Sequence, residues 1–134
     1  MTSLDTNVVL AAFDPRDASH QAALTLLDRV GAGGLVLCPV VYAELAASQA
    51  WEALKTFLQR TEAEVLWEMP QAVWERAGSA MGAYARMRRQ GVLPRRIAAD
   101  FLIGAHAEHH GLRLATLDPV IYRTVFEGVP LLLP

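Results

Sequence analysis

The sequence predicts an α/β protein, a three-layer α/β/α sandwich with a mainly parallel central sheet. Short, uninterrupted apolar runs alternate with segments of helical periodicity, and such runs are typical of strands buried on both faces. The chain has 134 residues, of which 53% are hydrophobic and 19% charged. This is enough apolar material for one sizeable core, and too few residues for a second domain of ordinary size. We therefore expect residues 1–134 to form a single domain.

The first half of the chain alternates strands and helices. Apolar residues at helical spacing follow Asp17, and the glycine-rich segment 31–34 ends this pattern as a helix C-cap does. The next apolar run leads into Pro39, and proline is favoured at the first position of a helix. The expected elements are a strand over 2–4, helices over 6–13 and 17–30, a strand over 35–38, and helices over 40–48 and 51–60.

The second half continues the alternation. Pro70 starts a long helical stripe, Leu93-Pro94 interrupts it, and Gly111 closes the helix that follows. A final apolar run lies near the C-terminus. The expected elements are a strand over 64–67, helices over 70–91 and 97–110, and strands over 112–117 and 129–133.

Composition excludes several classes of protein. The longest uncharged stretch with apolar character, residues 30–43, contains Pro39 and is shorter than the about 20 residues that span a bilayer. Asp5 lies where a signal peptide requires a basic start and then an apolar run, so we expect a cytoplasmic protein without a membrane partner. The only cysteine, Cys38, lies within an apolar run and is expected to be a buried free thiol.

Four acidic residues occupy unusually apolar surroundings. Asp5 and Asp118 each follow an expected strand, while Glu44 and Asp100 lie within apolar helices. In a parallel sheet, ligands bind beyond the carboxyl ends of the strands, where Asp5 and Asp118 are placed. A lone buried carboxylate is costly and needs a partner, a proton or a metal. A cluster of carboxylates suits a hard divalent ion such as Mg²⁺ or Mn²⁺.

Each of these acids also has a structural explanation. Asp5 could cap the helix that follows it, and Asp118, which precedes a proline, is an ordinary turn signal. Glu44 could lie on a solvated stripe of its helix. Asp100 is hardest to explain in this way, because aspartate is unfavourable inside a helix. One shared site accounts for all four.

The ordered set of acid-containing segments resembles a known family. The segments are Leu4-Asp5-Thr6-Asn7, Tyr42-Ala43-Glu44-Leu45, Ala99-Asp100-Phe101-Leu102-Ile103 and Leu114-Ala115-Thr116-Leu117-Asp118. In this order and spacing they resemble the PIN-domain ribonucleases, specifically the VapC-type toxins of toxin–antitoxin pairs. The resemblance implies a Mg²⁺- or Mn²⁺-dependent endoribonuclease, a homodimer, and a cognate antitoxin that blocks the site. It also implies that Asp5, Glu44, Asp100 and Asp118 are the catalytic and metal-binding quartet, supported by the hydroxyl of Thr116.

An arginine-rich segment is the expected contact with RNA. No acid occurs from Arg76 to Ala99, although the chain has a net charge of -2. A quartet of acids repels an RNA backbone, so a cationic surface must offset that repulsion. The alternatives are a solvated helical face and a contact with the antitoxin. The expected substrate-binding arginines are Arg88, Arg89, Arg95 and Arg96.

Other features support rival interpretations. His106 and His110 share a helical face, but no third ligand at zinc-site spacing accompanies them, so we do not expect zinc. The tryptophans are expected in the core or an interface. A haloacid-dehalogenase-like phosphohydrolase that uses Asp5 as nucleophile is the rival enzyme, yet such enzymes carry a second Asp where Asn7 stands here. A non-catalytic PIN-fold interaction module is the rival of another class.

Overall fold

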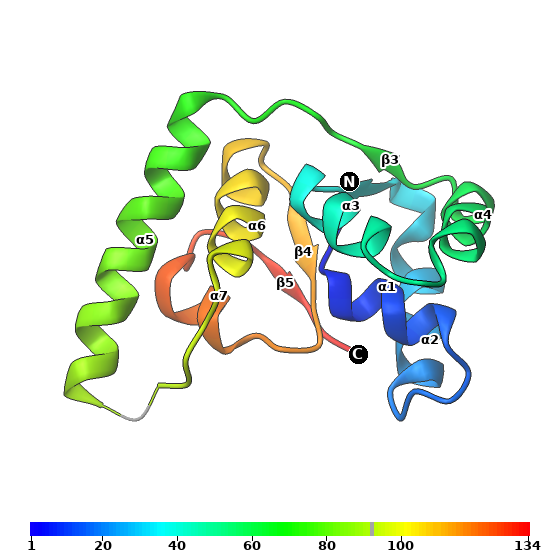
Figure 1. Ribbon diagram of the computed structural model, residues 1–134, viewed down its shortest axis with the longest axis horizontal. Helices are drawn as coiled ribbons and strands as arrows, with labels where there is room; N and C mark the ends of the chain where they lie inside the picture. The colour runs from blue at the N-terminus through cyan, green and yellow to red at the C-terminus, as the bar shows by residue number, and fades with distance from the viewer. Residues whose placement is uncertain (92) are drawn as a thin grey trace.

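The computed structural model describes residues 1–91 and 93–134, and its centre is a five-stranded parallel sheet (Figure 1). The strands are ordered β3-β2-β1-β4-β5 and every neighbouring pair is parallel, as the sequence predicts. The strands are β1 (Thr2–Leu4), β2 (Leu35–Leu37), β3 (Glu64–Val65), β4 (Arg113–Ala115) and β5 (Leu131–Leu132). β1 has the expected bounds, and the other strands are shorter than expected because apolar residues that flank them belong to the connections.

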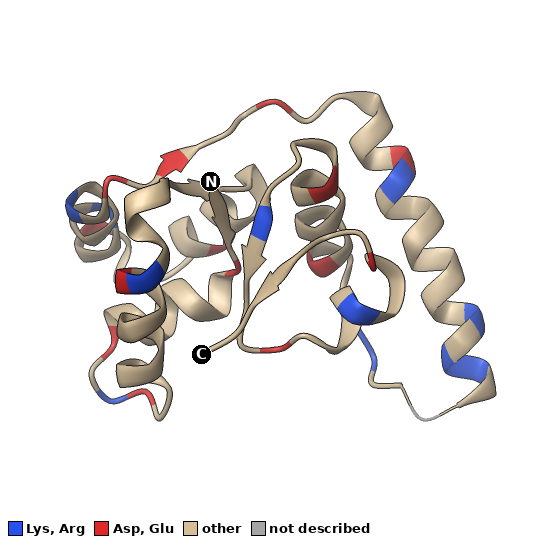
Figure 2. Cartoon of the chain, turned by 180° about the vertical axis from the view of Figure 1, so that it is seen from behind, with Lys and Arg blue, Asp and Glu red and all other residues tan. Residues whose placement is uncertain are grey.

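Helices pack on both faces of the sheet, as the opposed views of Figures 1 and 2 show, so the three-layer α/β/α sandwich is confirmed. The helices are α1 (Thr6–Phe13), α2 (His20–Val30), α3 (Pro39–Ala46), α4 (Trp51–Thr61), α5 (Gln71–Gln90), α6 (Ala98–His109) and α7 (Val120–Val125), with a short 3-10 turn, η1, at Gly31–Gly33. The sequence did not predict α7. None of these helices is long and apolar enough to cross a membrane.

The register of the two central strands positions the candidate site. Leu4 at the end of β1 lies opposite Ala115 at the end of β4, and the Asp5 backbone N–H donates to the Ala115 carbonyl at 2.9 Å. Asp5 and Thr116 therefore leave adjacent strands at the same edge of the sheet. That edge is the one at which parallel sheets bind ligands.

A close contact holds α6 and α7 together beside this edge. A Cβ atom added to Gly104 in α6 would lie 2.4 Å from the Phe126 ring, so only glycine allows the ring to pack there. Arg76 of α5 adds a second link, because its guanidinium binds Glu108 at 2.7 Å and donates to the Val125 carbonyl at 2.8 Å. Arg76, which bounds the acid-free stretch of the sequence, therefore has a structural role.

Two of the three tryptophans lie outside the core, so for them an interface, the other expected location, stays a prediction. Trp67 is 63% exposed and Trp74 is 53% exposed. Trp67 lies beyond β3, which is only two residues long and does not cover it. Trp74 follows the buried Val73 by one position, which turns it about 100° away from the buried face of α5.

Candidate active site

Asp5 is the most deeply buried carboxylate of the candidate site. It is 5% exposed and caps α1, since the Thr6 backbone N–H donates to its Oδ1 at 2.8 Å. The hydroxyls of Thr116 and Tyr122 both donate to Oδ2, at 2.8 and 3.0 Å. Burial raises the pKa of Asp5 above its ordinary value, while these hydrogen bonds oppose the rise. The helix-cap explanation of Asp5 is therefore correct, and the cap fixes the carboxylate at the strand end.

Glu44 reaches the same site from α3. Its Oε1 accepts a hydrogen bond of 2.7 Å from the hydroxyl of Thr6, the first residue of α1. The Glu44 side chain is partly exposed rather than on a fully solvated stripe. Its negative charge contributes to the raised pKa of Asp5, so the two carboxylates lie within each other's field.

Asp100 lies in the first turn of α6 and is half-buried. Within residues 1–91 and 93–134, no hydrogen bond reaches its carboxylate. Burial raises the pKa of Asp100 to about 6; the negative charge of Asp5 is the next cause, and Glu44 and Asp118 add to it. Asp100 therefore lies in the field of all three other acids, and the four predicted site carboxylates share one region.

Asp118 follows β4 and is held in two ways. Its backbone N–H donates to the Thr116 hydroxyl at 3.0 Å, and its Oδ2 accepts from Nη2 of Arg96 at 2.7 Å. This ion pair joins the segment before α6 to the segment after β4. The positive charge of Arg96 also opposes the rise in the Asp100 pKa. Arg96 is thus the one expected substrate-binding arginine that the structure links directly to the acids.

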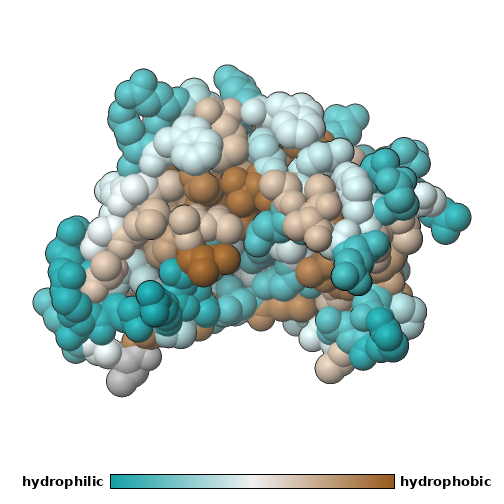
Figure 3. Space-filling view, in the orientation of Figure 1, coloured by the Kyte–Doolittle hydropathy of each residue, from teal (hydrophilic) through white to brown (hydrophobic). Residues whose placement is uncertain are grey.

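The other expected arginines lie farther along the surface. Arg88 and Arg89 occupy the last turn of α5 and are exposed, and Arg95 is exposed in the segment that leads to α6. Figure 2 shows basic residues at the lower end of α5 and, apart from them, on the segment that leads to α6, both at the same end of the molecule. In the space-filling view, hydrophilic residues gather at the lower end of α5 (Figure 3). The three exposed arginines suit a long anionic ligand. Among the described residues, no hydrogen bond or ion pair joins them to the four acids.

Three site residues were not assigned by sequence reasoning. Tyr122 of α7 is buried and donates to Asp5, which, with burial, raises the pKa of the tyrosine. Thr6 binds Glu44, and the Asn7 side chain accepts from the Leu117 backbone N–H at 3.1 Å. Thr6 and Asn7 lie inside the quoted Leu4-Asp5-Thr6-Asn7 segment, so their position was a usable signal. Tyr122 had none, because its helix was not predicted.

The site carries oxygen donors only, which is the donor chemistry of a hard divalent cation. The negative charges of the neighbouring carboxylates contribute to the raised pKa of Asp100, and a bound cation would relieve this repulsion. In the part of the chain that the structure describes, no three His, Cys, Asp or Glu side chains are grouped closely enough to hold an ion as they stand. The donor set therefore fits Mg²⁺ or Mn²⁺ in chemistry and in charge.

The histidines of α6 have structural partners. His106 Nε2 bonds to the Leu66 carbonyl and His110 Nε2 to the Glu68 carbonyl, each at 2.8 Å. Both rings thereby fasten the extended segment after β3 to α6. Each ring therefore has a structural role, and the expectation that these histidines do not bind zinc stays a prediction.

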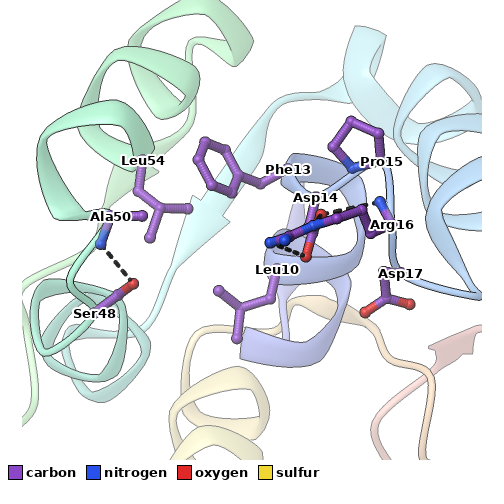
Figure 4. A pocket seen from close by; sticks show the side chains of 9 residues that line it. All are labelled: Leu10, Phe13, Asp14, Pro15, Arg16, Asp17, Ser48, Ala50 and Leu54. Carbon is purple, nitrogen blue, oxygen red and sulfur yellow. Dashed lines mark hydrogen bonds and ion pairs between the residues drawn. The ribbon is translucent and has the colours of Figure 1, made fainter.

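A large hollow of the surface lies apart from the acids. It has a volume of about 620 Å³ and opens between the end of α1 and the α3–α4 turn (Figure 4). Leu10, Phe13 and Leu54 give it apolar walls, and the Asp14–Arg16 ion pair lies at its rim. None of the four carboxylates lines it. The candidate active site is therefore defined by charge and hydrogen bonding rather than by this hollow.

Comparison with known proteins places this geometry in a family. The model of the PIN domain matches residues 3–127. The chain belongs to the PIN-domain family. No curated protein matches it. The matched range includes all four carboxylates, so the resemblance read from the acid-containing segments is confirmed.

Solved structures show the same fold for the PIN-domain chain. VapBC2 from Rickettsia felis, bound to a DNA fragment from its promoter, has 18% identity and a TM-score of 0.66, with 98% of this chain and 97% of that chain covered. FitAcB from Neisseria gonorrhoeae has 20% identity and a TM-score of 0.66, covering 98% and 96%. FitAB bound to the IR36 DNA fragment has 19% identity and a TM-score of 0.71, covering 100% and 95%. At these identities the likeness establishes the fold.

Proposed function

We propose that this PIN-domain protein is a VapC-type toxin, a divalent-metal-dependent endoribonuclease of a toxin–antitoxin pair. The observation that carries the proposal is that Asp5, Glu44 and Asp118 all lie within electrostatic reach of Asp100, beside the carboxyl ends of β1 and β4. A phosphodiester hydrolase needs such a cluster to hold a cation against a polyanionic substrate. The fold alone would not specify a nuclease, because one fold can support many functions.

We assign the metal to Asp5, Glu44 and Asp100, with Mg²⁺ or Mn²⁺ as the ion. When bound, the ion supplies a lowered pKa for a coordinated water and neutralises phosphate charge. Thr116 and Tyr122 hold the carboxylate of Asp5, and Thr6 holds that of Glu44. Asp100 has no such partner among the described residues and is largely ionised at pH 7.5, so its oxygens can orient the attacking water and accept its proton. No covalent nucleophile is required.

We propose RNA as the substrate and the arginine-rich segment as its contact. Arg88, Arg89 and Arg95 are exposed on one continuous stretch of chain, and Arg96 lies beside the acids. Guanidinium groups bind phosphate oxygens through paired N–H donors. An RNA strand that follows this stretch is led toward Asp100.

A cognate antitoxin and a second copy of the chain are the proposed protein partners. The similar structures are of VapBC and FitAB complexes, which supports a cognate antitoxin. We propose that the antitoxin covers the acidic site and that the pair acts in the cytoplasm. The rival phosphohydrolase has no support, because Asn7 is engaged with the Leu117 backbone and cannot act as the second acid.

Three purified proteins test the nuclease: the wild type, Asp5→Asn and Asp100→Asn. We expect the wild type to cleave RNA with Mg²⁺ or Mn²⁺, to stop in excess chelator, and to arrest growth when expressed alone. Both variants should fold, fail to cleave and relieve the arrest. Equal toxicity of the wild type and a folded Asp5→Asn protein would favour the non-catalytic interaction module. Full cleavage in chelator would exclude the metal mechanism.

A further inference from the structure

The Arg96–Asp118 ion pair distinguishes Asp118 from the other three acids. The distance from Nη2 to Oδ2 is 2.7 Å, and the Arg96 side chain is 18% exposed while that of Asp118 is 47% exposed. Asp5 and Glu44 accept hydrogen bonds from neutral groups, and none of the described residues donates one to the Asp100 carboxylate. Among the described residues, Asp118 is thus the only one of the four acids that forms an ion pair with a cation of the chain.

The pair has one contact and leaves most of the guanidinium unused. Arg96 donates to Asp118 through Nη2, and its buried Nε has no partner among the described residues. If Asp118 turned to a metal ion, it would leave a mostly buried arginine unpaired beside that ion, and uncompensated buried charge is strongly unfavourable. The arrangement therefore favours Asp118 as the anchor of Arg96.

We propose that Asp118 is a positioning residue that holds the Arg96 guanidinium at the edge of the acidic site, where Arg96 binds a phosphate of the RNA. This inference rests on the proposed nuclease function and deepens it. In this arrangement three of the acids bind the metal, and the fourth, Asp118, holds the arginine that binds the substrate.

Arg96 suits phosphate binding better than its neighbours do. Its side chain is mostly buried, so holding it in place has already cost the rotamer entropy that exposed Arg88, Arg89 and Arg95 would lose on binding. One Nη2 on Asp118 leaves the other terminal nitrogen for an oxygen of the phosphate. Arg96 also acts on the pKa of Asp100, so it lies within the field of the reacting group.

The first test asks whether removal of the Asp118 charge strengthens or weakens RNA binding. Removing a negative charge near RNA strengthens binding if the charge only repels the phosphates, whereas removing the anchor of Arg96 weakens it. We expect Asp118→Asn and Arg96→Gln each to raise KM about three- to tenfold, and Arg96→Gln to reduce the slope of log(kcat/KM) against log salt by about 0.7. Arg96→Lys should retain the slope. Asp28→Asn and Arg60→Gln, which make the same charge changes at exposed positions, should change neither quantity.

Calorimetric titration with Mn²⁺, in the absence of RNA, is the second measurement. We expect Asp118→Asn to keep the Mn²⁺ affinity within about threefold of the wild type, while Asp5→Asn and Asp100→Asn lose at least tenfold. A loss in Asp118→Asn equal to that in Asp5→Asn would overturn the inference and make Asp118 a ligand. Tighter RNA binding by Asp118→Asn, with an unchanged salt slope in Arg96→Gln, would also overturn it.

The double variant Asp118→Asn/Arg96→Gln separates a shared role from two independent ones. Because both substitutions disable the same contact, the KM of the double variant should equal that of Arg96→Gln. Additive effects would overturn the inference. Failure of the nuclease proposal is different: the wild type would then cleave no RNA with either ion, whereas failure of this inference leaves wild-type cleavage intact.

Discussion

The two sides of the acidic site are built differently. On the β1 side, Asp5 and Glu44 accept four hydrogen bonds from neutral donors, and Asp5 is almost fully buried. On the α6 side, Asp100 is half-buried, and no described residue bonds to its carboxylate. Hydrogen bonds fix the geometry of the first side before any ligand arrives, while the second side keeps an unused negative charge. A preorganised side and an unsatisfied side together make a site that gains most from a cation.

The largest effect should come from the β1 side, in Asp5→Asn. Asparagine is as good a helix cap as aspartate, and the Thr116 and Tyr122 hydroxyls can reorient toward an amide, so the fold should survive. RNA cleavage should fall more than about 100-fold, beyond the 10- to 100-fold typical of a residue that only supports a ligand. Circular dichroism and a cleavage assay on one preparation measure both outcomes. A folded variant with more than a tenth of the activity would remove Asp5 from the metal site.

Tyr122→Phe, also on the β1 side, should lower the rate of RNA cleavage about tenfold. It removes one hydroxyl that donates to Asp5 at 3.0 Å and leaves the ring in place. Because that hydrogen bond holds the pKa of Asp5 down, its loss should move the acidic limb of the pH–rate profile to higher pH. An unchanged profile would show that Tyr122 only fills space. Tyr42→Phe is the matched control, since Tyr42 packs against aromatic rings away from Asp5.

The stability of Asp100→Asn tests whether the α6 side carries an uncompensated negative charge. The pKa of Asp100 is raised to about 6 from 3.8, so the folded state holds its proton more tightly than the unfolded state. The stability contributed by this proton is complete below pH 3.8 and is lost as pH rises through about 6. At pH 7.5 without metal, Asp100→Asn should therefore be about 1 to 2 kcal/mol more stable than the wild type, a value reduced for solvent screening.

Thermal unfolding at two pH values measures this effect. The stabilisation should be present at pH 7.5 and absent near pH 4. Saturating Mg²⁺ should raise the wild-type Tm at pH 7.5 and leave the variant unchanged, because bound ligand stabilises only the state that binds it. Equal Tm values for the two proteins at both pH values would show that Asp100 carries no excess repulsion.

The sequence predicted the positions of some site residues but not the contacts that hold them. Asp5 and Asp118 were placed correctly because each follows an apolar strand, and the alternation of elements determines which strand ends meet. Tyr122 was missed because α7 has six residues, too few for a helical period to be recognised. The Arg96–Asp118 contact was missed because it joins two connecting segments whose paths no local pattern specifies. Local pattern thus predicted where the acidic side chains leave the sheet, and tertiary packing determined their hydrogen-bond and ion-pair partners.

The smallest effect should come from Thr6→Val, which removes the hydroxyl that donates to Glu44 at 2.7 Å. Valine has nearly the same shape, and the Thr6 backbone N–H that binds Asp5 remains, so Asp5 keeps its cap. Glu44 is partly exposed, and water can replace the lost donor, so the cost should be only about 0.5 to 1 kcal/mol. We expect an increase of about two- to fivefold in the Mn²⁺ dissociation constant, with kcat at saturating Mn²⁺ unchanged, because the freed carboxylate must be ordered again when the ion binds. Thr6→Ser, which retains the hydroxyl, should bind Mn²⁺ as the wild type does. A loss of Mn²⁺ affinity of about tenfold, as large as the effect expected of Tyr122→Phe, would mean that Glu44 depends on its hydrogen bond as strongly as Asp5 does. Hydrogen bonds would then preorganise the two carboxylates to the same extent.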